Sequence, residues 1–149
     1  MAADDIATRQ ATPADQPFLL NCFLRSMRET ITACRGQWDE VREREQFEHQ
    51  LVLETTHVIQ LDGVDVGFLM LVEEPATLQL HTLCVVPDYQ GRGIGSQVTR
   101  NVISEGQRRR RRVILSVLTS NIRAAALYER LGFRVVGESE HHRYMEHVA

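Results

Sequence analysis

A short glycine-rich passage, placed between a strand pattern and a helix pattern, limits most what this chain can fold into. Its residues are Gln90, Gly91, Arg92, Gly93, Ile94, Gly95 and Ser96. Glycines let a backbone approach an anion closely, and the free N–H groups at a helix start point toward that anion. Because Arg92 adds a positive charge, the passage predicts a pyrophosphate site. A glycine-rich turn without any ligand is the alternative that the glycines alone leave open.

Two common nucleotide-binding motifs do not fit this passage. The dinucleotide fingerprint requires a third glycine where Ser96 stands. It also requires an acidic residue about 20 residues further on, where this chain has arginines. The P-loop requires Gly-Lys-Ser/Thr, which is absent from the passage. Another way of holding a pyrophosphate is therefore expected.

Hydrophobic periodicity on both sides of the passage predicts one mixed α/β domain made of all 149 residues. The pair Asp62-Gly63 between two β-rich runs predicts a hairpin. In the second helix, Val41, Phe47 and Leu51 are expected to face the core. The expected strands are 6–12, 57–61, 64–72, 78–86, 113–118 and two within 133–148. The expected helices are one from Pro13 to a break around 34–36, one from 38 or 39 to 51, and two more at 93–107 and 121–131.

Composition argues against several classes of protein. The net charge of −3 is unlike that of a general nucleic-acid binder, which usually carries a basic excess. No apolar run approaches the roughly 20 residues of a membrane span, and the acidic N-terminus does not resemble a signal peptide. Cys22, Cys34 and Cys84 are few and widely spaced, so neither disulfides nor a metal site is expected. A cytoplasmic location is the natural expectation.

Two motifs together resemble the signature of the GNAT acetyltransferase family. Gln90-x-x-Gly93-x-Gly95 is similar to the family's acetyl-CoA loop, Gln/Arg-x-x-Gly-x-Gly/Ala. The later motif is Asn121-x-x-Ala124-x-x-Leu127-Tyr128-Glu129-x-Leu131-Gly132-Phe133. The resemblance is specific from about residue 78 to residue 133. It implies the GNAT fold, an α/β fold with a mixed sheet of six or seven strands, two parallel strands that splay apart, and about four flanking helices.

The resemblance also implies that acetyl-CoA is the co-substrate and that no metal is needed. The pantetheine arm would pair with the backbone of residues 83–85 like an added strand. The pyrophosphate would lie on the N–H groups from Gly91 to Ser96, and Asn121 would hydrogen-bond the pantetheine. The residues expected to bind acetyl-CoA are Leu83, Cys84, Val85, Gln90, Gly91, Arg92, Gly93, Ile94, Gly95, Ser96, Asn121, Ala124 and Tyr128.

By the same resemblance, Tyr128 would face the thioester sulfur and protonate the leaving thiolate. A core aromatic is the alternative interpretation of Tyr128. Cys84 is expected to be a small buried strand residue and not a nucleophile, because the family transfers acetyl directly to the amine. Related acetyltransferases often carry a glutamate base in the strand after the phosphate helix, and Ser116 occupies that position here.

His81 is therefore the candidate base, because the usual imidazole pKa of about 6.5 lies near working pH. Gln79-x-His81 is similar to the His-x-His of serotonin N-acetyltransferases, with only the second histidine kept. Strict alternation along a strand places His81 on the same face as Gln79, Leu83 and Val85. A strand histidine with a satisfied hydrogen bond is the alternative.

The implied reaction is acetyl transfer from acetyl-CoA to a primary amine of a small molecule or peptide, by direct attack in a ternary complex. A non-catalytic acyl-CoA-binding regulatory domain of the same fold is the alternative. The acceptor site is expected between the first two helices and the C-terminal strands, His141 to Tyr144. The residues expected to bind the acceptor are Met27, Arg28, Trp38, Asp39, Glu40 and His142.

The run Arg108–Arg112 invites a third interpretation, an RNA-binding module or a clamp for the 3′-phosphate of CoA. The negative net charge speaks against the module, and the length of the preceding helix places the run far from the pyrophosphate. Cations also complement a helix C-terminus, so a solvated helix end is the simpler interpretation. Neither nucleic acid nor a membrane is an expected partner, and a homodimer is left open.

Overall fold

Seven strands form one mixed sheet in the order β1-β2-β3-β4-β5-β7-β6 in the computed structural model, which describes residues 5–147. The strands are β1 (Ile6–Gln10), β2 (Thr56–Leu61), β3 (Val64–Glu73), β4 (Thr77–Val85), β5 (Arg112–Leu118), β6 (Phe133–Glu138) and β7 (His142–His147). The helices are α1 (Gln16–Arg35), α2 (Glu40–Gln50), α3 (Ile94–Arg109) and α4 (Ile122–Arg130). The predicted order of elements and the mixed α/β class are confirmed. The ends of the expected single domain, residues 1–4 and 148–149, lie outside the described residues.

The start and end of α1 follow from short-range chemistry. Thr12 donates its backbone N–H to the carboxylate of Asp15 at 2.8 Å, which is half of the capping box that the sequence indicates. Arg9 binds the same carboxylate at 2.8 Å and holds the pKa of Asp15 well below its usual range. The helix ends where Gly36 adopts a left-handed φ of 85°.

The inner face of α2 differs from the prediction. Val41 is 67% exposed, whereas Glu43 and Phe47 are 3% and 4% exposed. Glu43 and Phe47 are one turn apart and share a face, and Val41 lies on another face. The buried carboxylate of Glu43 is tolerated because the side chain of Arg35 lies 3.4 Å away.

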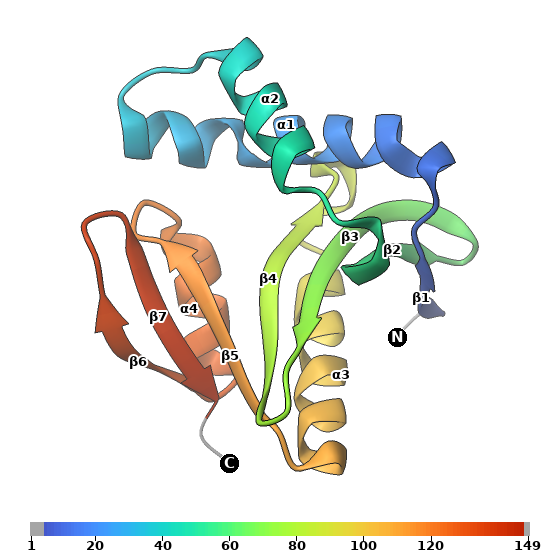
Figure 1. Cartoon of the computed structure of the whole chain (residues 1–149), viewed down its shortest axis with the longest axis vertical. Coiled ribbons are helices and arrows are strands. Elements are labelled where there is room, and N and C mark those ends of the chain that lie inside the picture. The colour runs from blue at the N-terminus through green and yellow to red at the C-terminus, as the bar shows by residue number, and fades with distance from the viewer. Residues whose placement is uncertain (1–4, 148–149) are drawn as a thin grey trace.

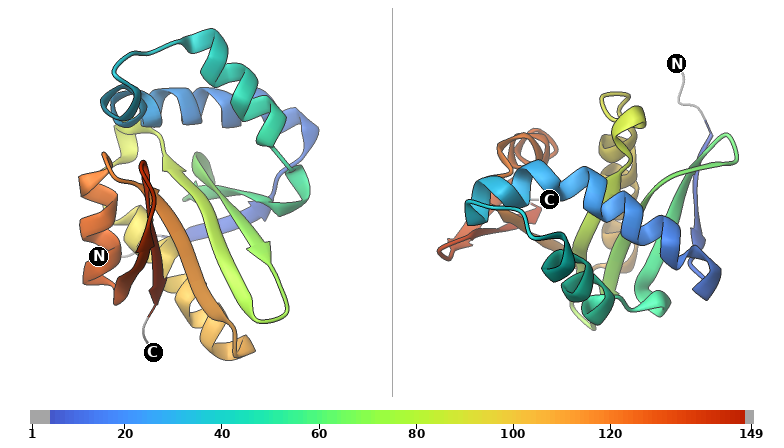
Figure 2. Two further views of the ribbon diagram at one scale, coloured as in Figure 1. Left: turned by 60° about the vertical axis from the view of Figure 1, so that its left-hand side comes forward. Right: turned by 90° about the horizontal axis from the view of Figure 1, so that it is seen from above.

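Helices cover both faces of the sheet (Figure 1). On one face α3 and α4 enclose a core with the sheet, whose largest members include Leu78, Met145 and Val98. On the other face α1 and α2 enclose a second core around Leu19, Phe47 and Phe68. Figure 2 shows α1 crossing one end of the sheet with α2 beside it. No helix among residues 5–147 is long and apolar enough to cross a membrane.

The two central parallel strands separate along their length. β4 and β5 pair only from Thr77 with Arg112 to Leu80 with Leu115. Beyond these pairs both strands continue, and they diverge toward their carboxyl ends near α1 (Figure 1). The predicted splay is therefore present, and it leaves backbone groups of both strands without a neighbouring strand.

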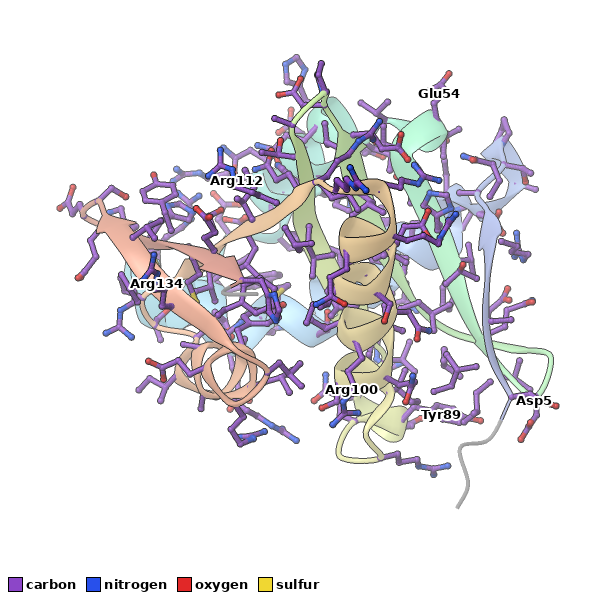
Figure 3. The ribbon with its side chains drawn as sticks, turned by 90° about the horizontal axis from the view of Figure 1, so that it is seen from below. Asp5, Glu54, Tyr89, Arg100, Arg112 and Arg134 are labelled. Atoms are coloured by element: carbon purple, nitrogen blue, oxygen red, sulfur yellow. The ribbon has the colours of Figure 1, made fainter. Side chains whose placement is uncertain are left out.

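Four of the five arginines in the run bind carboxylates of the chain itself, and Arg108 binds Glu105 on the same helix. Arg109 and Arg111 both bind Glu73 of β3, and Arg112 binds Glu146 of β7 at 2.9 Å. Figure 3 shows Tyr89 and Arg112 at opposite ends of α3. The run therefore ties α3 to the sheet at the end far from the glycine-rich loop, as the interpretation of a helix end expects.

Candidate active site

The glycine-rich loop joins β4 to α3 beside the splay. Gly91 and Gly93 each have a φ of 80°, a left-handed value that residues with side chains rarely adopt. Gly93 precedes α3 without any side-chain cap, and the N–H of Gln97 makes the first intrahelical hydrogen bond, to the Gly93 carbonyl. The three preceding N–H groups of the helix therefore have no partner in the described chain and can bind an anion.

Two arginines flank this loop. The guanidinium of Arg92 lies 4.7 Å from the ring centre of Tyr89, which keeps the charge beside the loop. Arg123 of α4 places an Nη2 atom 3.9 Å from the position that a Cβ on Gly91 would occupy. Neither arginine makes an ion pair within residues 5–147. The sequence did not predict that Arg123 lies beside this loop. Helical periodicity shows which face a residue occupies but not which distant loop that face contacts.

The backbone of β4 offers hydrogen-bonding groups to the splay. The Val86 N–H donates to the Val66 carbonyl of β3 at 2.8 Å. Backbone groups of successive residues alternate between the two edges of a strand. The N–H and carbonyl of Leu83 and Val85 therefore point toward the splay, whereas those of Cys84 point toward β3. An extended ligand arm can pair with two of the three residues expected to bind it.

The side chains of two further loop and strand residues are already engaged. Gln90 donates its side-chain amide to the Val85 carbonyl at 2.9 Å, which leaves the Val85 N–H for a ligand. Cys84 is 3% exposed, and burial raises the pKa of its thiol to about 12, with Ser26 acting in the opposite direction. At neutral pH Cys84 is therefore a protonated core residue, which agrees with the expected role.

Asn121 is the N-cap of α4. Its side-chain carbonyl accepts the N–H of Ala124 at 3.2 Å. This contact explains why the motif spaces the two residues by three, which is the usual N-cap geometry. The side-chain amide group of Asn121 retains its two donors for a ligand in the splay.

Tyr128 is a buried residue of α4, only 7% exposed. Its ring packs edge-on against Phe133, with ring centres 5.7 Å apart. Burial, with a smaller contribution from Cys84, raises the pKa of the phenol above its usual value. No partner for its hydroxyl is found among the described residues. The hydroxyl therefore keeps its proton at neutral pH and is free to donate it.

The strand that carries His81 contains a β-bulge at that residue. Met70 pairs with Thr82 and Leu71 pairs with Leu80, so His81 is left without a partner on β3. A bulge puts two consecutive residues on one side of a strand and shifts the alternation beyond it. The Nδ1 of His81 lies 2.9 Å from the Thr82 hydroxyl, as expected for two neighbours on the same side.

The prediction that the His81 side chain shares a face with Leu83 and Val85 is therefore wrong. Leu80 and Leu83 both pack in the core beneath α3 and α4, which strict alternation does not allow. Cys84 packs in the core beneath α1 and α2. His81 thus lies on the α1 side of the sheet, away from the side chains of Leu83 and Val85. It is exposed, and its Nε2 is free to meet a ligand that approaches from the α1 side.

Three of the expected acceptor residues lie together between α1 and α2. The guanidinium of Arg28 lies over the Trp38 ring, 5.4 Å from its centre. Both residues line a pocket of about 720 Å³ with Glu40, which Arg44 binds at 3.5 Å. The indole N–H of Trp38 is buried and has no hydrogen-bond partner among the described residues.

The other three expected acceptor residues lie elsewhere. Met27 packs against the core beneath α1, and Asp39 caps α2 by accepting the Arg42 N–H at 3.2 Å. His142 pairs with Leu118 at the carboxyl end of β5, across the splay from β4. Met27 and Asp39 thus make contacts within the chain, and their binding of the acceptor stays a prediction. The structure leaves His142 near the splay but outside the pocket.

Comparison with known proteins supports a single family. A family model described as the acetyltransferase (GNAT) family matches residues 24–133. An uncharacterized N-acetyltransferase of Methanocaldococcus jannaschii is 33% identical over 84 residues, covering 51% of this chain and 37% of that protein. The N-alpha-acetyltransferase RimI of Mycobacterium tuberculosis is 43% identical over 63 residues, covering 42% and 39%. The chain thus matches less than half of the length of these two relatives.

Solved structures show the same fold. The PaiA N-acetyltransferase of Thermoplasma acidophilum, in complex with coenzyme A, superposes with a TM-score of 0.73 at 19% identity, covering 97% of this chain and 99% of that one. An acetyltransferase of Thermus thermophilus has a TM-score of 0.70 at 25% identity, covering 95% of each chain. No group of three or more His, Cys, Asp or Glu residues suited to a metal ion occurs within residues 5–147.

Proposed function

The chain belongs to the GNAT acetyltransferase family, and from that premise we propose that it transfers acetyl from acetyl-CoA to a primary amine. The acceptor is an amine of a small molecule or a peptide, and it attacks the thioester directly in a ternary complex. The observation that carries this proposal is the splay of β4 and β5, which ends at a loop with unpartnered N–H groups. An extended arm in the splay and a pyrophosphate on the loop suit acetyl-CoA.

The buried tyrosine favours an enzyme over a non-catalytic acyl-CoA-binding domain. The Tyr128 hydroxyl has no hydrogen-bond partner in the described chain, yet it is not among the fully enclosed unpartnered atoms, so it is accessible to a ligand or to water. The phenol is neutral at pH 7, and its raised pKa keeps it so. An accessible neutral hydroxyl can donate a proton to a leaving thiolate.

The proposed reaction needs two proton transfers by this chain. His81 accepts a proton from the acceptor ammonium, directly or through a water, so that the amine nitrogen can attack the thioester carbonyl. The new C–N bond forms as the tetrahedral intermediate appears, and the attached nitrogen loses its second proton to solvent. Collapse of the intermediate then breaks the C–S bond. Tyr128 then donates its proton to the departing thiolate and recovers one from solvent. Acetylated amine and free CoA are the products.

A release assay tests the proposed function. Acetyl-CoA is incubated with the protein and a panel of primary amines and peptides, and free thiol is followed over time. We expect at least one acceptor to release thiol in proportion to the acetylated product found by mass spectrometry. Tight binding of acetyl-CoA without acceptor-dependent thiol release from any member of the panel would identify a binding domain instead.

Replacing His81 with glutamine is expected to lower kcat/KM and to remove the acidic limb of its pH profile. The limb arises because protonation of a histidine base at low pH stops it from accepting the amine proton. The measurement is kcat/KM for the best acceptor across the pH range. His49→Gln, in the exposed last turn of α2, is the matched control and should keep the limb. An unchanged profile in His81→Gln would show that the amine loses its proton to solvent.

Replacing Arg123 with glutamine is expected to weaken CoA binding by about threefold to tenfold at low ionic strength, since charge-assisted contacts to phosphate are strong. The loss should shrink in high salt, because exposed charges are screened. Calorimetry with CoA at two ionic strengths measures both effects. Arg130→Gln, an exposed arginine in the last turn of the same helix, is the control. Equal affinities of the two variants would exclude Arg123 from the site.

A further inference from the structure

The pocket between α1 and α2 is much longer than a single amino group, so it has room for more of the acceptor than its reacting amine. Its volume of about 720 Å³ falls in the range of ligand sites, roughly 300–1,000 Å³. It follows α1 from Gln16 to Arg28, a rise of about 18 Å along the helix. Figure 2 shows the two helices side by side above the sheet. A groove of this length suits an extended segment of about five residues.

One wall and the floor of this α1–α2 groove are apolar. Leu20 and Leu24 line it from α1, and Phe47 lines it from α2. Phe47 also belongs to the core beneath the helices, so the floor is rigid. Such a surface binds aliphatic or aromatic groups through the hydrophobic effect.

The two ends of the groove differ in charge. Arg28, held on the Trp38 ring, makes no ion pair within residues 5–147. Arg25 has only a long contact of 3.8 Å with Asp88, whose side chain is 80% exposed. Glu48 lines the groove two turns of α2 beyond the Glu40 end. At the Arg28 end, the carboxylate of Glu40 is paired with Arg44 at 3.5 Å. Arg28 and Arg25 therefore leave that end positive, although the whole chain carries a net charge of −3.

The Arg28 end is also the end nearest to the splay. Ser120, in the turn after β5, donates its hydroxyl to the Thr30 carbonyl of α1 at 2.9 Å. Arg25 of α1 reaches Asp88 in the turn after β4. Residues 25–30 of α1 thus span the carboxyl ends of the two diverging strands, and Arg28 lies within that span.

We propose that the α1–α2 groove binds the part of the acceptor that follows the reacting amine, and that this part carries a carboxylate on an apolar stem. Arg28 binds the carboxylate, and Leu24 and Phe47 contact the stem. This inference rests on the proposed acetyl transfer and narrows its acceptor to anionic, partly apolar amines. A short acidic peptide fills the whole groove, whereas a free amino acid with a side-chain carboxylate fills only the Arg28 end.

The test compares pentapeptides of alanine and leucine that have a free N-terminal amine. Glutamate is placed at the second, third or fifth position, and matched peptides carry glutamine there. We expect glutamate at the second or third position to raise kcat/KM about tenfold over glutamine, the worth of a charge-assisted hydrogen bond. Glutamate at the fifth position, toward Glu48, should give no gain. Free L-glutamate as acceptor distinguishes a small substrate from a peptide.

Variants of Arg28 assign the preference to this side chain. Arg28→Gln should reduce the glutamate preference to within about twofold, and Arg28→Lys should retain part of it, because lysine keeps the charge but not the fork of donors. Arg42→Gln, on α2 but outside the groove, is the matched control and should behave like the parent protein. Arg28→Glu should prefer peptides that carry lysine instead of glutamate.

A binding measurement separates this inference from the proposed function. Trp38 is the single tryptophan of the chain, so its fluorescence reports on the groove. An N-acetylated peptide with glutamate at the second position, which cannot react, should change that fluorescence, and its Kd should rise in Arg28→Gln. Glutamate and glutamine peptides that react equally in all variants would overturn the groove proposal but not acetyl transfer. Selective binding of acidic peptides without any transfer would overturn acetyl transfer alone.

Discussion

Replacing Tyr128 with phenylalanine is expected to lower kcat for acetyl transfer by about 100-fold or more, within the range of a positioned acid. The affinity for acetyl-CoA should hardly change, because the ring keeps its packing against Phe133 and only the hydroxyl is lost. Single-turnover kinetics measure the chemical step, and calorimetry measures the affinity. The physical reason is that the neutral hydroxyl of Tyr128 has no partner in the described chain and can donate its proton to the thiolate.

The parent protein is the reference for this prediction, because Tyr128→Phe removes a single hydroxyl. If Tyr128→Phe and the parent protein have the same single-turnover rate, solvent protonates the thiolate and Tyr128 is a core aromatic only.

Replacing Gly93 with valine is expected to weaken acetyl-CoA binding by at least about tenfold, which corresponds to 1.4 kcal/mol. A Cβ at this position would meet no atom within 4 Å, so the effect does not arise from a clash. It arises from the φ of 80°, which costs a β-branched residue roughly 1–2 kcal/mol or more. The loop then relaxes to a negative φ, and the N–H groups of the first turn of α3 no longer converge on the pyrophosphate.

Gly63→Val separates backbone strain from loss of the site. Gly63 has a φ of 83° in the turn between β2 and β3, and a Cβ there also meets nothing within 4 Å. Both variants should lose thermal stability, whereas only Gly93→Val should lose affinity in calorimetry. An unchanged acetyl-CoA affinity in folded Gly93→Val would remove the loop from the site.

The two glycines that the sequence treats as equivalent differ in the folded chain. Gly95 has no left-handed φ, and a Cβ there would meet Leu127 and Leu83 at 3.8 and 3.9 Å, an ordinary contact distance. Gly95→Ala should therefore cost less affinity than Gly93→Val. The motif identifies the loop, but only the backbone conformation shows which of its glycines is required.

The parts of the candidate site that depend on neighbouring residues could be predicted from the sequence. The glycine loop, the Asn121 cap and the helix after it lie within one stretch of the chain, and periodicity predicts their elements without a partner. The prediction that β4 and β5 splay apart came from the family resemblance. No residue pattern in either strand indicates where their pairing stops. The roles of Tyr128 and His81 stay predictions until the kinetics are measured.

Several assignments failed because they depend on the pairing partner. Whether His81 follows alternation is decided by β3, where Met70 and Leu71 pair with residues on either side of it. Val41 was expected inside because it is apolar, but Arg35 makes the buried position acceptable for Glu43. The arginine run lies at the predicted helix end, but its ion-pair partners Glu73 and Glu146 are far away in sequence and were not predicted.

The sequence by itself determined the order of elements, the glycine-rich loop and the family, because each depends on the φ preferences and periodicity of neighbouring residues. The tertiary structure alone decided the face of His81, the approach of Arg123 to the loop and the groove beside Arg28. Each of these requires two segments that are distant in the chain to meet. Their contact is set by strand register and helix packing, which a run of neighbouring residues does not contain.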